Sequence, residues 1–387
     1  MSDLKPDIDI NGWPSIVSAI VLGTIGVLSF IVQPGLVQGF VTILGFSESG
    51  ANDLAFVEMA GIALATYITA LVSRRLNWRI IIGAGLVLAA IGNAGSALTG
   101  SGSMFEVARF VTGLGEGAII SMNFAIIGLT MRIERNLALN LLLLLTYGAL
   151  GLWAMPWAFS TIGLKGIFLV WAVLTTASLV TLPFLPRSAQ SATEPSPTAV
   201  NLGWPMLVIA MLAVVLYNTA IGTAWANLFL IGMEIRPDEQ AIANALLLAQ
   251  FVAIAGALIP VFLEARLGRW IPLITGILFG AGALALLVGK PTYAMFVIAV
   301  GGFNFFWNFV LPFILSTIGD MRRGEILSIV IAMQMTGLGF GPFIAARLLG
   351  EGRGFQTVLA LTVGLMIASL VLLAIAKISR RRLFAAG

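Results

Sequence analysis

The sequence predicts an all-α integral membrane protein whose twelve transmembrane helices form two pseudo-symmetric six-helix bundles. Three observations predict this fold: an apolar composition, apolar segments of spanning length, and a weak repeat between the two halves. Of the 387 residues, 59% are hydrophobic and 10% are charged, whereas soluble domains are about 45–50% apolar and about 25% charged. This number of charged side chains is too small to cover the surface of a soluble protein of this size. We therefore expect the bilayer to surround most of the surface.

The individual spans follow from the length that a helix needs to cross a bilayer, which is about 20 mainly apolar residues. Charge-free or nearly charge-free segments of this length recur along the whole chain. We expect spans at 16–40, 52–72, 80–99, 104–131, 137–160, 164–185, 204–232, 239–263, 271–288, 293–317, 326–348 and 355–376.

The orientation of these spans follows from the lysines and arginines in the short loops, which favour the cytoplasmic side. With both termini inside, 15 of the 21 basic residues fall on the inner side and 4 in outer loops. The remaining two, Arg109 and Arg347, lie inside predicted spans. We therefore expect a multi-pass protein of the bacterial inner (cytoplasmic) membrane with both termini in the cytoplasm.

The longest polar interruption, 186–203, divides the chain almost at its midpoint. It is rich in Pro, Ser, Thr and Ala and has no apolar periodicity, which predicts a flexible cytoplasmic linker. The linker would separate an N-terminal six-helix bundle, residues 1–185, from a C-terminal six-helix bundle, residues 204–387.

Two basic loops suggest that these halves are repeats of one another. Superposing Arg75 on Arg266 gives an offset of 191 residues, and the same offset places Arg132 on Arg323. Because both matches lie at the same place within each half, they indicate an internal six-helix repeat.

The composition also excludes several functions. The chain has no His and no Cys, which removes disulfides, imidazole or thiolate metal sites, and Ser–His or Cys–His catalysis. It contains no G-x-x-x-x-G-K-[ST] nucleotide loop, as an ATP-driven pump would need. Its basic residues lie in short clusters between apolar runs, which argues against nucleic acid binding. We expect no enzymatic activity, no cofactor, no metal and no nucleic acid partner, and the two-half repeat disfavours a channel.

This topology, with a basic loop between spans two and three, resembles the major facilitator superfamily. The signature of that family in the loop is G-x-x-x-D-R-x-G-R-R. At its G, D, R, G, R and R positions this chain has Ala70, Arg74, Arg75, Asn77, Trp78 and Arg79. The motif is therefore degenerate, because Arg replaces the acidic residue and both glycines are lost. The resemblance implies an inner gate at this loop and at its repeat, with the candidate gating residues Arg74, Arg75, Arg79, Arg266 and Arg269.

Span four matches the family more closely. RFVTGLGEGA at 109–118 fits the R-x-x-x-G-x-G pattern of that helix, and the added Glu116 resembles the anion:cation symporter branch. The resemblance implies that Arg109 and Glu116 serve substrate binding and proton coupling. The charged residues that this branch usually carries in span one are absent, since 16–47 contains no ionisable acid or base.

Charges inside predicted spans are independent candidates, because each costs about 2.5–3.5 kcal/mol to insert. Arg109 and Glu116 are two helical turns apart and share a face, so both can face one cavity. We expect Glu116 to carry a coupling proton and Arg109 to bind substrate. The alternative is that Arg109 pairs with Glu106 or reaches the interface, and that Glu116 is a packed acid. Glu58 is a second proton-coupling candidate, or else a structural ion-pair partner or a rim charge.

Spans seven and ten gather polar and aromatic residues that could complete a substrate site. Amides hydrogen-bond carboxylates and hydroxyls, and rings bind flat or apolar groups. The alternative is that these side chains make interhelical hydrogen bonds or face lipid. The candidates are Tyr217, Asn218, Trp225, Asn304, Trp307 and Asn308, with Gln33, Gln38 and Tyr147 on the same argument.

These observations predict a secondary transporter that works by alternating access. We expect proton-coupled symport of a small organic anion, a carboxylate that could also carry an aromatic or apolar part, because an arginine binds a carboxylate bidentately. One alternative is efflux of drugs or metabolites by proton antiport, and another is a membrane receptor that binds without transport. The expected partners are the substrate, the coupling proton and membrane lipid, and the protein would function as a monomer.

The topology can be tested with protease on either side of the membrane. Protease added to inside-out vesicles should cut the chain within 186–203, because this polar segment would be exposed in the cytoplasm. Protease added outside intact cells should leave the chain whole. Cleavage in the linker from outside would contradict the predicted orientation.

Overall fold

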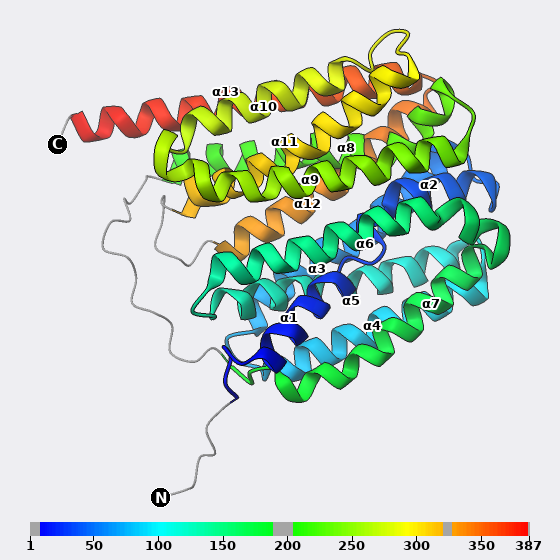
Figure 1. The fold of residues 1–387 in the computed structure, drawn as a ribbon, viewed down its shortest axis with the longest axis horizontal. Helices are drawn as coiled ribbons and strands as arrows, with labels where there is room; N and C mark the ends of the chain where they lie inside the picture. The colour runs from blue at the N-terminus through cyan, green and yellow to red at the C-terminus, as the bar shows by residue number, and fades with distance from the viewer. Residues whose placement is uncertain (1–7, 189–203, 320–326, 386–387) are drawn as a thin grey trace, which may run out of the picture. The chain divides into compact units, whose positions relative to one another are not determined.

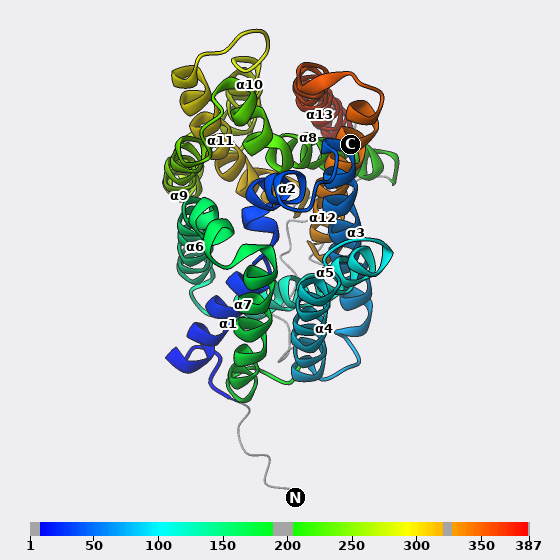
Figure 2. The same cartoon turned by 90° about the vertical axis from the view of Figure 1, so that its right-hand side faces the viewer.

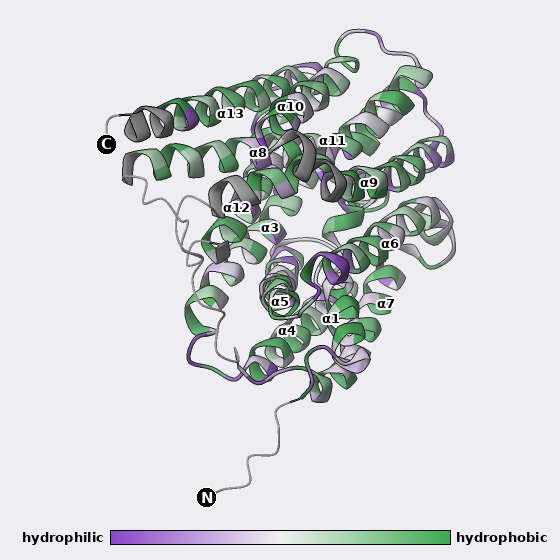
Figure 3. Cartoon of the chain, turned by 60° about the vertical axis from the view of Figure 1, so that its left-hand side comes forward, coloured by the Kyte–Doolittle hydropathy of each residue, from purple (hydrophilic) through white to green (hydrophobic). Residues whose placement is uncertain are grey.

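The computed structural model describes residues 8–188, 204–319 and 327–385, and this part of the chain is helical without any strand (Figure 1). Within it, ten helices are long and apolar enough to cross a membrane, one bent pair passes the same test together, and Trp270–Ala285 is a shorter apolar helix. Each of these coincides with one of the twelve predicted spans, and hydrophobic residues run along all of them (Figure 3). The predicted all-helical membrane fold is confirmed.

The helices of the first half are α1 (Trp13–Ile25), the short 3-10 helix η1 (Phe30–Val32), α2 (Gln33–Thr42), α3 (Glu48–Val72), α4 (Trp78–Thr99), α5 (Ser103–Gly128), α6 (Ile133–Thr161), α7 (Gly163–Ala177) and the 3-10 helix η2 (Ser178–Phe184). Those of the second half are α8 (Trp204–Ile235), α9 (Glu239–Leu267), α10 (Trp270–Ala285), α11 (Tyr293–Gly319), α12 (Leu327–Gly350) and α13 (Gly354–Ala385). The predicted linker at 186–203 lies outside the described residues except for 186–188, as does Arg323 of the predicted repeat.

Span one is broken, although its sequence reads as one apolar segment. Helix α1 ends at Ile25 with Gly26 as its C-cap, and the segment Phe30–Thr42, made of η1 and α2, is bent from α1 by 49°. Pro34 lies in the first turn of α2 and has no N–H, so an α-helix cannot run through this point with its hydrogen bonds intact. The break leaves a turn at 26–29 in the middle of the span.

Contacts divide the chain into two compact units. Unit one comprises Met1–Val32, Val57–Tyr147 and Trp157–Glu194, and unit two comprises Gln33–Phe56, Gly148–Pro156 and Pro195–Gly387. Unit two therefore includes, besides the helices of the second half, α2, the first part of α3 and a short stretch of α6. In our orientation these three pieces are the outer ends of spans one, two and five.

Glycines let helices within each unit approach closely. In unit one, α4 runs beside α5 and α7 (Figure 2), and a Cβ added at Gly92 or Gly115 would overlap atoms of the neighbouring helix. In unit two, α8 packs on α12, where a Cβ at Gly222 or Gly341 would overlap backbone of the partner helix. Small residues of this kind are typical of helix contacts in membranes, where backbones pack without large side chains between them.

Candidate functional site

Three spans of unit one meet at a cluster of buried polar groups. The Ser29 hydroxyl, in the break of span one, lies 2.7 Å from both carboxyl oxygens of Glu116 on α5 and also hydrogen-bonds Oε1 of Glu58 on α3. Glu58 is 4% exposed and Glu116 is 1% exposed. One hydroxyl therefore bridges two buried carboxyl groups.

Arg109 completes this cluster, which we call the carboxyl network (Ser29, Glu58, Arg109 and Glu116). Its Nη2 forms an ion pair with Oε1 of Glu58, and its Nη1 donates to Oδ1 of Asn93 at 3.1 Å. The guanidinium carbon lies 4.9 Å from the centroid of the Phe168 ring. A buried charge is tolerated when it is paired and hydrogen-bonded, and Arg109 meets both conditions.

This geometry decides between two sequence interpretations of Arg109. The side chain is completely buried, whereas Glu106 is exposed on the same helix. Arg109 therefore neither reaches the interface nor pairs with Glu106. Its partner is Glu58, which lies on α3 and not at the rim of the protein.

The break in span one creates the position of Ser29. Its backbone N–H donates to Oε1 of Glu116 at 3.4 Å, and the neighbouring carbonyl of Leu28 accepts from the hydroxyl of Tyr147 at 2.9 Å. Backbone groups at membrane depth must find partners within the protein. Glu116 and Tyr147 supply these partners, so Tyr147 stabilises the broken helix.

The glycines of span four bring α3 against α5 at the level of the network. A Cβ at Gly113 would overlap the carbonyl oxygen of Glu58, and a Cβ at Gly117 would overlap that of Ile62. From the other side, a Cβ at Gly61 would overlap the carbonyl of Phe110. The R-x-x-x-G-x-G pattern thus lets the Glu58 backbone pack directly on α5, next to Arg109.

The candidates in spans seven and ten lie in unit two. The rings of Trp225 on α8 and Trp307 on α11 are 5.7 Å apart, so these two residues come together. The amides of Asn218 and Asn308 donate to carbonyls one turn earlier in their own helices, at 2.9 Å and 3.0 Å. These two hydrogen bonds agree with a structural role. They use only the NH₂ group of each side chain, so its carbonyl oxygen can accept from another partner.

Several buried polar atoms of unit two have no hydrogen-bond partner within the described part of the chain. Such an atom costs about 1–3 kcal/mol when nothing binds it, so each is a candidate contact for a ligand or water. Four belong to residues that the sequence analysis singled out and two to residues that it did not. They are Oε1 of Gln33, the hydroxyl of Tyr217, Oδ1 of Asn304, Oε1 of Gln38, Nε2 of Gln250 and Nε2 of Gln334.

The candidate gating loop is held by backbone contacts. Nε of Arg79 donates to the Leu185 carbonyl at 2.7 Å, and Asn77 caps α4 by accepting from the backbone N–H of Arg79 at 2.9 Å. Arg74 and Arg75 are exposed. In the repeat of this loop, Arg269 precedes α10, while the side chain of Arg266 lies outside the described part of the chain.

Ser29, Asn93 and Phe168 were missed by the sequence analysis. Serine and asparagine are common in membrane helices and give no signal of their own. Gly26 and Pro34, on either side of Ser29, could have revealed the break, because both residues interrupt helices.

No family model matches the chain, and no curated protein matches it either. Solved structures do match it. A D-xylose–proton symporter is 15% identical with a TM-score of 0.71, covering 93% of this chain and 97% of its own. The POT family transporter PepTSo is 11% identical with a TM-score of 0.74, covering 96% and 99%. The nucleoside transporter NupG is 13% identical with a TM-score of 0.71, covering 93% and 99%.

The chain has the major facilitator fold. Identities this low show the fold alone, and they leave the anion:cation symporter branch as a prediction. The fold alone assigns no role to the carboxyl network, so its role must follow from its own geometry.

The close contact of α3 with α5 can be tested at Gly113. Gly113→Ala should destabilise the protein by about 1–3 kcal/mol, the usual cost of overpacking, because the new methyl group would displace the Glu58 backbone from α5. The matched control is Gly128→Ala at the end of the same helix, where no atom lies within 4 Å of the new Cβ. Thermal unfolding of both purified variants measures the difference, and equal midpoints would contradict the packing argument.

Proposed function

We propose that this chain is a secondary transporter that works by alternating access and takes up a small organic anion together with a proton. It would lie in the bacterial inner membrane with both termini in the cytoplasm, as its basic loops favour. The observation that carries this proposal is the carboxyl network, in which one serine hydroxyl bridges two buried carboxyl groups and a single guanidinium neutralises one of them.

The hydrogen bonds of Ser29 support a proton in the network. A hydroxyl has one hydrogen to donate, yet Ser29 lies within hydrogen-bond distance of carboxyl oxygens of both Glu58 and Glu116. If it donates to one, the other contact is attractive only when that carboxyl is protonated and donates to the hydroxyl. Both contacts of Ser29 can therefore be hydrogen bonds when one of the two carboxyl groups carries a proton.

The charge balance also indicates that the network contains one bound proton. Glu58 and Glu116, when both are ionised, carry two negative charges against the single positive charge of Arg109. An unpaired carboxylate is costly in a buried site, and one bound proton makes the network neutral. Glu116 has no cation as a hydrogen-bond partner among the described residues and is the natural position for this proton.

The same network supports an anionic substrate. Arginine presents a planar fork that binds carboxylates in a bidentate manner, and Arg109 already holds the carboxylate of Glu58. A substrate carboxylate that takes this place releases Glu58, which stays neutral by accepting the proton of Glu116 through the bridging Ser29 hydroxyl, and Glu116 then takes up a further proton from solution. Anion and proton are thereby loaded together, which is the charge coupling of a symporter.

Polar contacts in unit two support a closed outer end. Asn52 and Asn227 exchange two amide hydrogen bonds of 2.8 Å and 3.0 Å, and Arg347 pairs with Asp53 at 3.0 Å. These contacts join the first part of span two to spans seven and eleven. Exposed ion pairs contribute little energy, so the Asp53 pair can form and break as access alternates.

The role of Glu116 can be tested with Glu116→Gln, which imitates the protonated acid. The variant should still exchange substrate in counterflow, because the loaded carrier can reorient, but it should fail to accumulate substrate from a pH gradient. Both assays use the same proteoliposomes. Intact concentrative uptake would exclude Glu116 as the essential proton carrier and leave Glu58 as the next acid to test.

The bridge itself is tested by Ser29→Ala. This change should shift the pH dependence of proton-driven uptake, because the two carboxyl groups lose their shared partner. Ser15→Ala is the matched control, since Ser15 is a buried serine of α1 whose hydroxyl has no hydrogen-bond partner among the described residues. A pH profile that both variants share with the wild type would contradict the bridging role.

The anion site is tested by Arg109→Lys. The charge survives but the planar fork is lost, so uptake of the anionic substrate should fall at least about tenfold, equivalent to losing about 1.4 kcal/mol of binding. Arg353→Lys, at an exposed position, is the control and should transport normally. Wild-type uptake by Arg109→Lys would place substrate binding elsewhere.

A further inference from the structure

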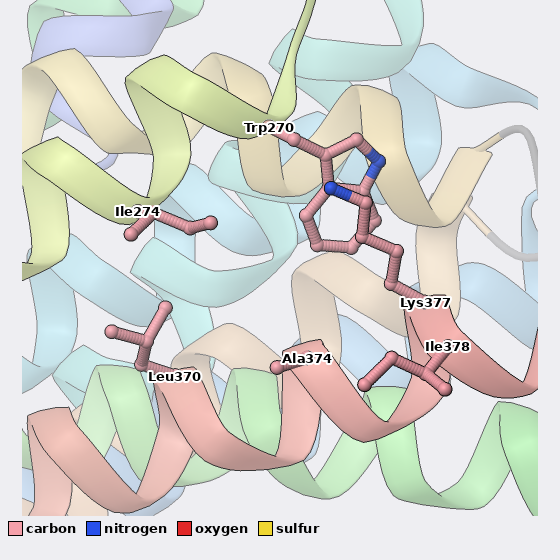
Figure 4. Close-up of a pocket in the computed structure, with 6 residues that line it drawn as sticks. All are labelled: Trp270, Ile274, Leu370, Ala374, Lys377 and Ile378. Atoms are coloured by element: carbon pink, nitrogen blue, oxygen red, sulfur yellow. The ribbon is translucent and has the colours of Figure 1, made fainter.

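A groove lies between α10 and α13 of unit two, and none of its lining residues is among the candidate substrate-binding, proton-coupling or gating residues. Its volume is about 250 Å³, and it is lined by Trp270 and Ile274 of α10 and by Leu370, Ala374, Lys377 and Ile378 of α13 (Figure 4). The lining is apolar apart from the Lys377 ammonium and the Trp270 indole N–H. The two helices pack side by side (Figure 1).

The groove has a polar end and an apolar end. Trp270 begins α10, and Lys377 lies in the last third of α13. Ile274 is one turn further along α10, and Leu370 is two turns before Lys377, which is about 10 Å along the helix axis. Tryptophan and lysine are typical of the membrane interface, so the groove runs from the interface into the hydrocarbon layer.

The polar end carries a fixed positive charge. Nζ of Lys377 lies 4.4 Å from the centroid of the Trp270 ring, a cation–π contact that holds the ammonium at the mouth of the groove. A second basic residue, Arg269, immediately precedes Trp270 in the chain. Basic residues beside an apolar groove on the cytoplasmic side are suited to anionic lipid headgroups.

We propose that this groove binds a phospholipid with an anionic headgroup from the inner leaflet. One acyl chain lies along Ile274, Leu370 and Ala374, and the headgroup phosphate pairs with Lys377. A zwitterionic lipid with the same acyl chains fits the groove equally well, but Lys377 attracts its headgroup, which has no net charge, less strongly. The site is independent of the transported substrate and of the carboxyl network.

Native mass spectrometry of the full chain in a non-ionic detergent tests the headgroup. Dioleoyl phosphatidylglycerol should bind more tightly than dioleoyl phosphatidylcholine. Lys377→Gln should weaken phosphatidylglycerol binding about fivefold, the effect of one basic residue at an anionic surface, and leave phosphatidylcholine unchanged. Lys165→Gln, at an exposed position on the predicted outer side, is the control and should bind both lipids as the wild type does.

The groove itself is tested by filling it. Ala374→Phe should reduce binding of both lipids, and Ala374→Leu is the smaller substitution if the phenylalanine variant does not fold. Glycerol phosphate, a headgroup without chains, should not bind. The proposal is overturned if the two lipids bind equally, if Lys377→Gln keeps the wild-type preference, or if the filled groove retains wild-type phosphatidylglycerol binding.

Discussion

The ion pair between Arg109 and Glu58 is the interaction on which the arrangement of unit one depends. Neither charge is tolerable alone in a buried site, so α3 and α5 must meet where these residues lie. Gly113 removes the side chain that would keep the two helices apart. Asn93 then accepts from Nη1 of the guanidinium, and the Phe168 ring lies against it. The positions of helices α3, α4, α5 and α7 are thereby tied to one charged group.

The broken span one joins this charge pair to the second acid. A continuous helix would satisfy its own backbone and would offer only a side chain to α5. The break instead directs both the hydroxyl and the N–H of Ser29 to Glu116, while the Leu28 carbonyl is satisfied by Tyr147. A local interruption of secondary structure thus becomes a connection between two acids on different helices.

The sequence predicts the fold well because membrane insertion depends on segment length and hydrophobicity, which can be counted residue by residue. It also places Arg109 and Glu116 on one helix face, since that relation is local. It does not predict the break in span one, because hydropathy does not register backbone hydrogen bonds. Nor does it predict Ser29 or Asn93, whose importance arises from neighbours on other helices. For Glu58 the sequence allows a proton-coupling role, a structural ion pair or a rim charge, and its partner Arg109 is seen only when α3 and α5 are placed side by side.

The unpaired polar atoms of unit two are all neutral, whereas the buried ion pair and the second acid belong to unit one. The buried charged groups and these unpaired neutral groups are therefore different sets of side chains on different helices. Substitutions at Tyr217, Gln250, Asn304 or Gln334 change hydrogen-bonding preferences without altering the number of buried charges. Such neutral groups can be exchanged while the buried ion pair stays intact, which is one physical route to new hydrogen-bonding preferences on an unchanged fold.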